Sequence, residues 1–571
     1  MKKNIISASI LILVVTCSIL GIVCCGGNKE KDEVIMDFAP MATPKPDIFG
    51  TNGMVVAAGP ISASSGLKVL QDGGNAFDAL ITVAALLTLE QPMNCGIGGH
   101  GIGMFYSSKT GKLTTLDFGG GLPKKFTIDQ WGTPPEIPGR GLLATILPGT
   151  LKGWDTILKA YGTISIADAL APAIHYAEKG VPFRPDVIGT VDYLGGVKKF
   201  ELYPELAKAL IIDGRIPEIG DLLKRPDLAK SYELIAERGA DVFYKGELGD
   251  KIIKFLNDHG SRFTKEEFEN YEPVWREVIS TKYRDEYEVF VPKAQVSSPQ
   301  ILTLLNIWEN YDFSKIGNMS ADYVHIMVES LKFAIANRAN FYGDPEFSDI
   351  PFDMITSKSY GKKIANGIDM NKSKDREFWS NRELGKGHTT HFCVVDKEGN
   401  IAAITQTLGN WFGAIEVVPG TGITLNNEGI FFDLTPEDGP NYPEAGKKSQ
   451  HDMSPTLVFM NGKPYMAVGT PGGEAIPQII AQVIHKIIDF GMTPQQAIDE
   501  PRFVDGGVSK GGFGNMSKEE YKKLLAKGHR ADDLIPIEGK GNCGVPAAII
   551  IDEKNDVLLG GINWNGIVVG Y

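Results

Sequence analysis

The sequence lacks the short motifs that mark many hydrolases and metalloenzymes. Its 571 residues contain no HExxH zinc motif, no CxxC pair and no GxxxxGK[ST] phosphate-binding loop. The nine histidines are scattered along the chain and show no ligand spacing. We therefore expect no metal and no cofactor, and any catalysis has to use a less common arrangement of side chains.

The chain also lacks an excess of positive charge. Asp and Glu number 70 against 57 Lys and Arg, which gives a formal net charge of −13. A nucleic-acid partner would require a basic face, so this balance argues against one. A hydrophobic content of 43% with 22% charged residues is typical of a globular protein with a large core.

Cysteine is scarce, with six in the whole chain. Three lie within the first 25 residues, and the other three, Cys95, Cys393 and Cys543, are far apart. This number and spacing exclude a disulfide framework, although a single bridge among the last three stays open.

Residues 1–25 have the layout of an export signal, with two lysines before an uncharged apolar run that starts at Ile5. The run is also long enough to span a bilayer as an uncleaved anchor. A lipoprotein signal is a third alternative, because Cys25 precedes a polar tether at residues 26–50, although Cys24 stands where a small residue is preferred. We expect an exported protein, periplasmic or extracellular, with membrane attachment through the N-terminus or a lipidated Cys25 left open.

Helix signals dominate the first part of the chain. Residues 63–92 predict two helices, the first capped by Ser64 or Ser65 and the second by Asn75. Further along, the patterns predict a hairpin at 104–118, mostly helices at 150–285 and a long amphipathic helix at 320–342.

Strand signals dominate from residue 388 onward. They comprise a meander, an Asn-Gly hairpin at 454–473 and a final strand pair at 546–570, with one helix at 474–490. Helices followed by antiparallel strands, without βαβ alternation, predict a layered α+β fold. The glycine run "GIGGHGIG" at 96–103 lacks the strand and helix that flank a nucleotide-binding loop, which favours a structural turn.

Two threonines open the strand "HTTHFCVVD", and they allow two interpretations. Threonine is simply a good strand residue. Alternatively, Thr389 is a hidden N-terminus that is exposed when the His388–Thr389 bond is cut. A free α-amino group has a pKa of roughly 7.7–8.0 and could take the proton of the Thr389 hydroxyl at neutral pH. The glycines at 385 and 387 would allow the strained geometry that self-cleavage needs.

A second feature suits acyl transfer. The stretch "GTPGGEAIP" places Gly472 and Gly473 directly before a predicted helix, where backbone N–H groups can stabilise an oxyanion. The alternative is an ordinary loop whose glycines serve turn geometry.

Many stretches together resemble one family. They are spread along the chain after the export signal: "GMVVAAGPISASSGLKVLQDGGNAFDALITVAALLTLEQP", "GIGGHGIGMFY", "LPGTLKGWDTILKAYG", "SSPQILTLLNIWENYDF", "FAIANRANFYGDPEF", "TTHFCVVDKEGNIAAITQTL", "LNNEGIFFD", "MSPTLVF", "GTPGGEAIPQ" and "AIDEPRF". In this order they resemble the γ-glutamyltransferase (glutathione hydrolase) family of the N-terminal-nucleophile hydrolase superfamily.

The resemblance implies a four-layer αββα sandwich and a precursor that cuts itself. A large subunit of residues 51–388 and a small subunit of residues 389–571 would form one domain as a heterodimer acting on a small-molecule amide. Thr389 would be the nucleophile and, through its new amine, the base. Thr407 would support it, and Gly472 with Gly473 would form the oxyanion hole.

The substrate-binding positions depart from what the resemblance implies. Gly119 stands where the family has an arginine that clamps the glutamyl α-carboxylate, and His451 with Asp452 replace a pair of serines. Lys124 and Lys125 lie near Gly119 in sequence, and a protonated His451 could also offer positive charge.

The positions that read the α-amino group are partly kept. Glu428 is retained, whereas Phe431 takes the place of an aspartate. Gly409 stands where an asparagine is usual, with Asn410 one step later. Because a lost arginine clamp removes two charge-assisted hydrogen bonds, the glutamyl specificity is in question.

Three functions follow from this resemblance and its departures. The first is a self-processing γ-glutamyl hydrolase or transferase that works through an acyl-threonine ester. The second is an acylase for non-glutamyl amides, of the glutaryl or cephalosporin kind. The third is a lipid-anchored binding protein that kept the fold without turnover.

Overall fold

The computed structural model describes residues 45–374, 388–504, 507–508, 516–529, 544–563 and 566–571. The chain divides into two compact units, Met1–Pro40 and Met41–Tyr571, and every described residue belongs to the second. The expected export signal, the glycines at 385 and 387, and Cys543 lie outside the described residues.

No helix in the described ranges combines the length and the apolar character that crossing a membrane would require.

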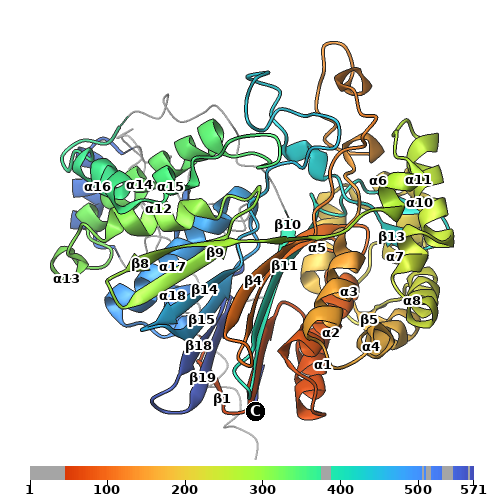
Figure 1. Cartoon of the computed structure of the whole chain (residues 1–571), viewed down its shortest axis with the longest axis horizontal. Coiled ribbons are helices and arrows are strands. Elements are labelled where there is room, and N and C mark those ends of the chain that lie inside the picture. Colours follow the sequence, from red (N-terminus) through yellow and green to blue (C-terminus); the bar gives the residue numbers. More distant parts are fainter. Residues whose placement is uncertain (1–44, 375–387, 505–506, 509–515, 530–543, 564–565) are drawn as a thin grey trace, which may run out of the picture. The chain divides into compact units, whose positions relative to one another are not determined.

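Two antiparallel sheets form the centre of this unit, and each has seven strands in the described part of the chain (Figure 1). The first sheet has the order β1 (Ile48–Gly50), β19 (Val557–Ile562), β18 (Ala547–Asp552), β15 (Lys463–Gly469), β14 (Thr456–Met460), β9 (Tyr287–Pro292) and β8 (Val278–Tyr283). The second has the order β20 (Ile567–Gly570), β2 (Gly53–Ala57), β10 (His388–Asp396), β11 (Ile401–Gly409), β3 (His100–Ser107), β4 (Lys112–Asp117) and β7 (Val274–Arg276).

The strands of both sheets alternate between two apolar environments. In β10, Cys393 and Val395 pack between the sheets against residues such as Ala467 of β15. Phe392 and Val394 face the opposite way, into the helical layer. Because successive side chains of a strand point to opposite faces, a strand buried on both sides is apolar throughout.

Helices cover the outer face of each sheet (Figure 1). Against the second sheet lie α1 (Pro60–Gln71), α2 (Ala76–Glu90), α3 (Thr150–Tyr161), α4 (Ile166–Lys179) and, further out, α8 (Pro226–Arg238). Against the first lie α12 (Pro299–Trp308), α14 (Ala321–Phe341), α17 (Ile476–Phe490) and α18 (Pro494–Asp499). The four-layer αββα sandwich is thereby confirmed.

Shorter elements connect these layers. They are α5 (Pro185–Tyr193), α6 (Gly196–Phe200), α7 (Pro204–Leu210), α9 (Asp241–Tyr244), α10 (Glu247–Asp258), α11 (Lys265–Glu269), α13 (Phe313–Ile316), α15 (Phe352–Ile355), α16 (Lys358–Asn366), α19 (Lys518–Ala526), β5 (Val181–Pro182), β6 (Leu222–Leu223), β12 (Val417–Val418), β13 (Ile423–Thr424), β16 (Phe503–Val504) and β17 (Gly507–Val508).

The helix pair at the start of the chain is confirmed, with one correction. Asn75 caps α2, since its side chain accepts hydrogen bonds from the backbone N–H groups of Phe77 and Asp78. The first helix, however, begins at Pro60, before the predicted caps Ser64 and Ser65. The distant Glu90 carboxylate accepts the N–H groups of its first turn at 2.7 and 3.1 Å, so no local cap was needed.

Most strand predictions are also confirmed, but the final pair predicted at 546–570 is three strands, of which β18 pairs with β19 and β20 pairs with β2 of the second sheet. The β3–β4 and β14–β15 hairpins lie where they were predicted, and in the latter turn Asn461 and Gly462 both have positive φ. The predicted tether differs at its end, because residues 48–50 already form edge strand β1 on β19. The Lys45 ammonium donates to the carbonyl of Asn563 at 3.0 Å just before it.

The described cysteines are not bridged. Cys95 and Cys393 are both free and buried, so a bridge between them is excluded. Burial raises the pKa of each thiol to about 12, which keeps both in the unreactive thiol form at neutral pH.

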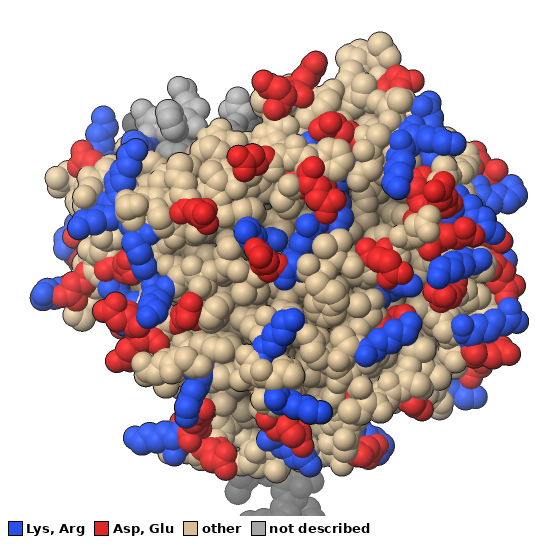
Figure 2. Space-filling model, viewed as in Figure 1, with Lys and Arg blue, Asp and Glu red and all other residues tan. Residues whose placement is uncertain are grey.

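Charged side chains of both signs are mixed over the face shown in Figure 2. Some exposed charges pair along a helix, as Lys68 does with Asp72 at 2.8 Å. Exposed pairs of this kind contribute little to stability.

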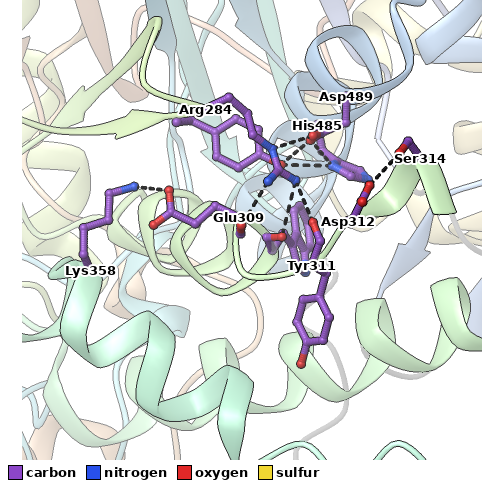
Figure 3. Close-up of polar contacts among 10 residues, drawn as sticks. Arg284, Glu309, Tyr311, Asp312, Ser314, Lys358, His485 and Asp489 are labelled. Carbon is purple, nitrogen blue, oxygen red and sulfur yellow. Dashed lines mark hydrogen bonds and ion pairs between the residues drawn. The ribbon is translucent and has the colours of Figure 1, made fainter. Parts of the chain in front are cut away.

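A partly buried polar network joins the end of the first sheet to α12 and α17 (Figure 3). Arg284 donates from Nε to Asp489 at 2.6 Å and from Nη1 to the carbonyl of Glu309 at 2.9 Å. His485 lies 2.7 Å from the same Asp489 carboxylate, which also accepts the Tyr283 hydroxyl. Burial alone would raise the pKa of Asp489, but His485, Tyr283 and Arg284 outweigh it and lower that pKa.

We expect Asp489→Asn to lower the free energy of unfolding by about 2 kcal/mol at pH 7, because it leaves the Arg284 charge without its anion. The depressed pKa means that this contribution is present at neutral pH and is lost as pH falls below about 4. Urea unfolding measures both effects. Asp72→Asn, in an exposed pair, is the control and should change stability by less than about 0.5 kcal/mol. Equal changes in the two variants would contradict a role for this network.

Candidate active site

Thr389 lies at the start of β10, where the space between the two sheets ends. It is opposite Thr407 of β11, and the next strand, β3, places His100 opposite Thr407. Directly opposed residues have their side chains on the same face. Cys393 and Val395 fix that face as the one between the sheets, so all three side chains project into the same space.

The Thr407 hydroxyl contacts the bond that was predicted to be cut. It donates a hydrogen bond to the carbonyl oxygen of His388 at 2.6 Å. The backbone N–H of Gly409 donates to the same hydroxyl oxygen at 2.8 Å. With this lone pair engaged, the hydroxyl proton is directed at the His388 carbonyl, which it polarises toward nucleophilic attack. The sheet register shifts between His388 and Thr389, so the bond lies at an irregularity of the strand.

The His388 side chain is held from one side. Its ring stacks on the indole of Trp411, with centroids 3.8 Å apart and planes 14° from parallel. Arg140 in turn donates to the Trp411 carbonyl at 2.5 Å and to the Gly413 carbonyl at 2.9 Å. His388, the residue before the predicted nucleophile, is therefore held in place at both its carbonyl group and its side chain.

The loop with Gly472 and Gly473 approaches from the other sheet. His391, on the same face of β10 as Thr389, packs so closely on Gly469 that a Cβ there would lie 2.2 Å from its ring. Gly469 ends β15, and three residues later Gly472 and Gly473 have φ of 141° and 57°. Only glycine adopts such angles without strain. A 3₁₀ turn over Gly473–Ala475 and then helix α17 follow, so the N–H groups at the start of these elements are available to an anion.

Asp452 has a different environment from the one expected of a substrate ligand. It is buried and accepts from Arg338 Nε at 3.1 Å. Arg338 also lies 3.3 Å from Glu474, the neighbour of Gly473. Asp452 therefore belongs to a chain of ion pairs that reaches the glycine loop through Arg338 and Glu474, and its role in binding substrate stays a prediction.

His100 is a residue of this site that sequence analysis missed. Its Nε2 lies 3.0 Å from Oε2 of Glu428, and both side chains are buried. Burial raises the pKa of Glu428, while the nearby His100 opposes that shift. The glycine run at 96–103 was interpreted as a turn, but its second half forms β3. A histidine inside a glycine-rich strand was the one available signal.

Gly119 lies close to His100 and Asp117. A Cβ at this position would lie 3.2 Å from Oδ1 of Asp117 and 3.3 Å from Nδ1 of His100. Asp117 binds the Lys448 ammonium at 2.7 Å and lies 3.6 Å from Arg276. Burial would raise its pKa, but Lys448, the Gly119 N–H and Arg276 lower it to about 2.

The residues considered as replacements for the positive charge of the missing arginine clamp do not provide that charge. Burial lowers the pKa of His451 to about 3, so its imidazole is neutral at physiological pH and cannot act as the cation that was considered. Lys124 and Lys125 are exposed to solvent, unlike the buried His100, Glu428 and His451. His451 nevertheless lies beside His100, with the two ring centroids 5.3 Å apart.

The turn after β11 explains why position 409, where the family usually has an asparagine, is a glycine and is followed by Asn410. Gly409 has φ of 98°, and a Cβ there would lie 2.4 Å from Oδ1 of Asn427 and 3.3 Å from Oε2 of Glu428. A side chain at this position would collide with both groups. Asn410 is half-exposed and donates its backbone N–H to Asn427 at 2.9 Å. Phe431 is buried in the turn after Glu428.

An αββα sandwich with a threonine at the start of a central strand, facing the space between the sheets, defines the class of N-terminal-nucleophile hydrolases. The family model described as gamma-glutamyltranspeptidase matches residues 62–563. The chain therefore belongs to the γ-glutamyltranspeptidase family of enzymes.

Known proteins resemble it over most of its length. It is 34% identical over 532 residues to the glutathione hydrolase-like YwrD proenzyme of Bacillus subtilis, covering 91% of this chain and 98% of that one. It is 34% identical over 528 residues to the glutathione hydrolase proenzyme of Escherichia coli, covering 86% and 89%. The crystal structure of cephalosporin acylase from Bacillus halodurans superposes with a TM-score of 0.82 at 28% identity, covering 93% and 98%.

Proposed function

We propose that this chain cuts itself between His388 and Thr389 and then uses the freed Thr389 to hydrolyse or transfer small-molecule amides. The proposal rests mainly on one observation. The Thr407 hydroxyl donates to the His388 carbonyl, directly across from Thr389, in a strand that faces the inter-sheet space. A merely structural threonine pair would not need a hydroxyl aimed at the carbonyl of the preceding residue.

Self-cleavage would begin with attack of the Thr389 hydroxyl oxygen on the His388 carbonyl carbon. The C–N bond breaks, the Thr389 nitrogen takes the proton, and the acyl group moves from nitrogen to oxygen. Water then hydrolyses the ester, which leaves a carboxylate on His388 and a free amine on Thr389. The oxyanion that forms on the way would take the hydrogen bond that Thr407 already makes.

Turnover would repeat this chemistry on a substrate. The Thr389 amine takes the hydroxyl proton while the oxygen attacks the amide carbon. The proton passes to the leaving amine as the C–N bond breaks, and water or a second amine resolves the ester. The N–H groups of Gly472 and Gly473 would stabilise the oxyanion of both steps.

For the acyl group, we propose γ-glutamyl or related amides. The names of the glutathione hydrolase relatives and the buried Glu428 support the γ-glutamyl assignment. A non-glutamyl acylase is the second candidate, because Gly119 leaves no arginine clamp and a cephalosporin acylase shares the fold closely.

The remaining expectations stay proposals. The large and small fragments would form a heterodimer, since β10 of the small fragment pairs with β2 of the large one and β11 pairs with β3. We also propose export to the periplasm or the exterior, with the type of N-terminal attachment set by residues 1–25.

A time course of the freshly purified full chain tests the self-cleavage. We expect a denaturing gel to show the full chain converting into bands of about two-thirds and one-third of its mass. The smaller band should begin with the sequence TTHFCVV. A single persistent full-length band would contradict both enzyme proposals and favour a binding protein.

A further inference from the structure

Three aromatic rings meet at the residue that precedes the predicted cut. The His388 ring lies on the Trp411 indole, with centroids 3.8 Å apart and planes 14° from parallel. The ring of Tyr193, from α5, contacts the same indole at a steep angle, with centroids 5.2 Å apart and planes 78° from parallel. These three residues form the aromatic stack. It connects His388 to the turn after β11 and to a helix from a distant part of the chain.

The turn that carries the indole is itself held by another segment. Arg140 donates from Nη1 to the carbonyl oxygens of Trp411 and Gly413, at 2.5 and 2.9 Å. The backbone N–H of Gly141 donates to the carbonyl of Ala414 at 3.2 Å. The backbone of Trp411 is therefore fixed by residues 139–141, and its ring is fixed by Tyr193. The indole can act as a firm surface for the His388 ring.

The strand β10 restrains its own first residue less than it restrains the residues that follow. Strand β2 pairs with Cys393 to Asp396 of β10, well past the predicted cut. Strand β11 pairs with β10 from its start, but the register shifts between His388 and Thr389. The direction of the His388 carbonyl depends on rotation about the soft backbone bonds on its two sides. Sheet pairing limits the rotation on the Thr389 side, and the aromatic stack limits it on the His388 side.

The direction of this carbonyl decides whether the hydroxyl of Thr389 can attack it. Attack needs the reacting atoms about 3–3.5 Å apart and aligned, and a misplacement of about 1 Å can cost about 100-fold in rate. The Thr407 hydroxyl holds the carbonyl oxygen of His388 at 2.6 Å. A His388 ring that left the indole would let the Cα of that residue move while its oxygen stayed. The stack therefore fixes a second point of the same residue.

We propose, on the basis of the self-cleavage described above, that Trp411 is a positioning residue for maturation. Its indole holds the His388 ring so that the His388 carbonyl carbon faces the Thr389 hydroxyl, and Tyr193 supports the indole. Trp411 moves no proton and acts only through His388. It follows that position 388 favours a flat ring, because a flat ring is what stacks on an indole.

A double-variant cycle tests this role. It compares the unaltered chain, Trp411→Ala, His388→Ala and the chain with both changes, by the rate at which each full chain converts into two fragments on a denaturing gel. We expect each single variant to be cut about 10-fold more slowly, because each removes one aromatic contact. The double variant should be no slower than either single variant, since both changes remove the same contact.

Conservative variants and a distant tryptophan are the controls. Trp411→Phe and His388→Phe each keep a flat ring in the stack and should be cut within about 3-fold of the unaltered rate. Trp275 is 43% exposed and lies on β7, the edge strand of the second sheet far from β10, so Trp275→Ala should stay within about 2-fold. Urea unfolding of Trp411→Ala combined with Thr389→Ala, which cannot cut itself, shows whether the variant folds.

The outcomes distinguish this inference from the function on which it rests. If the unaltered chain is never cut, self-cleavage is refuted and this inference fails with it. If the unaltered chain matures and both single variants mature at its rate, only the inference is overturned. Effects that multiply to about 100-fold in the double variant would also overturn it. Should Trp411→Ala not fold, His388→Ala and His388→Phe still decide, because equal slowing in these two would show that the stack does not matter.

Discussion

Thr389→Ala is expected to remain a single full-length chain and to have no measurable amidase activity. The substitution removes the hydroxyl that would attack the His388 carbonyl carbon. Because the same oxygen would attack both its own peptide bond and the substrate, maturation and turnover are lost together. We expect kcat/KM to fall by at least about 10⁴-fold relative to the matured enzyme.

Thr389→Ser is the matched control for this variant. It keeps the hydroxyl and should therefore still convert into two fragments. Gel electrophoresis over time and hydrolysis of γ-glutamyl anilide measure the two functions. A Thr389→Ala protein that is cut at residue 388, or that turns over substrate as the uncut chain, would show that another group is the nucleophile.

Thr407→Val is expected to have the second-largest effect and to act mainly on maturation. Valine has the same shape but cannot donate the hydrogen bond that the His388 carbonyl accepts at 2.6 Å. It also leaves the Gly409 N–H without its acceptor. Loss of one oxyanion donor typically costs a factor of 10² to 10³, so self-cleavage should slow by about 100-fold.

Thr390→Val and Thr407→Ser are the control variants for this measurement. Thr390 is also buried in β10, but its hydroxyl has no hydrogen-bond partner among the described residues, so its replacement should leave the cleavage rate within about 2-fold. Thr407→Ser restores a hydroxyl and should recover most of the rate. Equal cleavage rates in Thr407→Val and the unaltered chain would exclude a role for the 2.6 Å contact.

The sequence was most informative where the pattern is local. The Asn75 cap, the Asn461–Gly462 turn and the alternating faces of β10 depend on residues that are close along the chain. The four layers came from the family resemblance, because packing between distant strands leaves no local trace.

The site was harder to predict because its residues come from separate elements. His100 was hidden in a glycine run, and only the β3–β11 register places it beside Thr407. The neighbours of Asp452 in the sequence could not show that Arg338 of α14 pairs with it. The predicted start of α1 was wrong for the same reason, because the residue that caps this helix, Glu90, lies at the far end of α2.

The fold itself explains why cleavage would not separate the fragments. Thr389 begins a strand that is hydrogen-bonded on both sides, to β2 and to β11. The new N-terminus would therefore be held in the sheet and remain facing the inter-sheet space. A nucleophile that is created by a cut needs a scaffold that does not move when the cut is made.

The most direct test of the central claim is to locate the acyl group during turnover. The matured protein would be mixed with γ-glutamyl anilide, quenched in acid within the first turnover and mapped by mass spectrometry. The account predicts one added acyl group on a peptide that begins with Thr389. An acyl group on any other residue, or turnover by a chain in which Thr389 is still joined to His388, would contradict it.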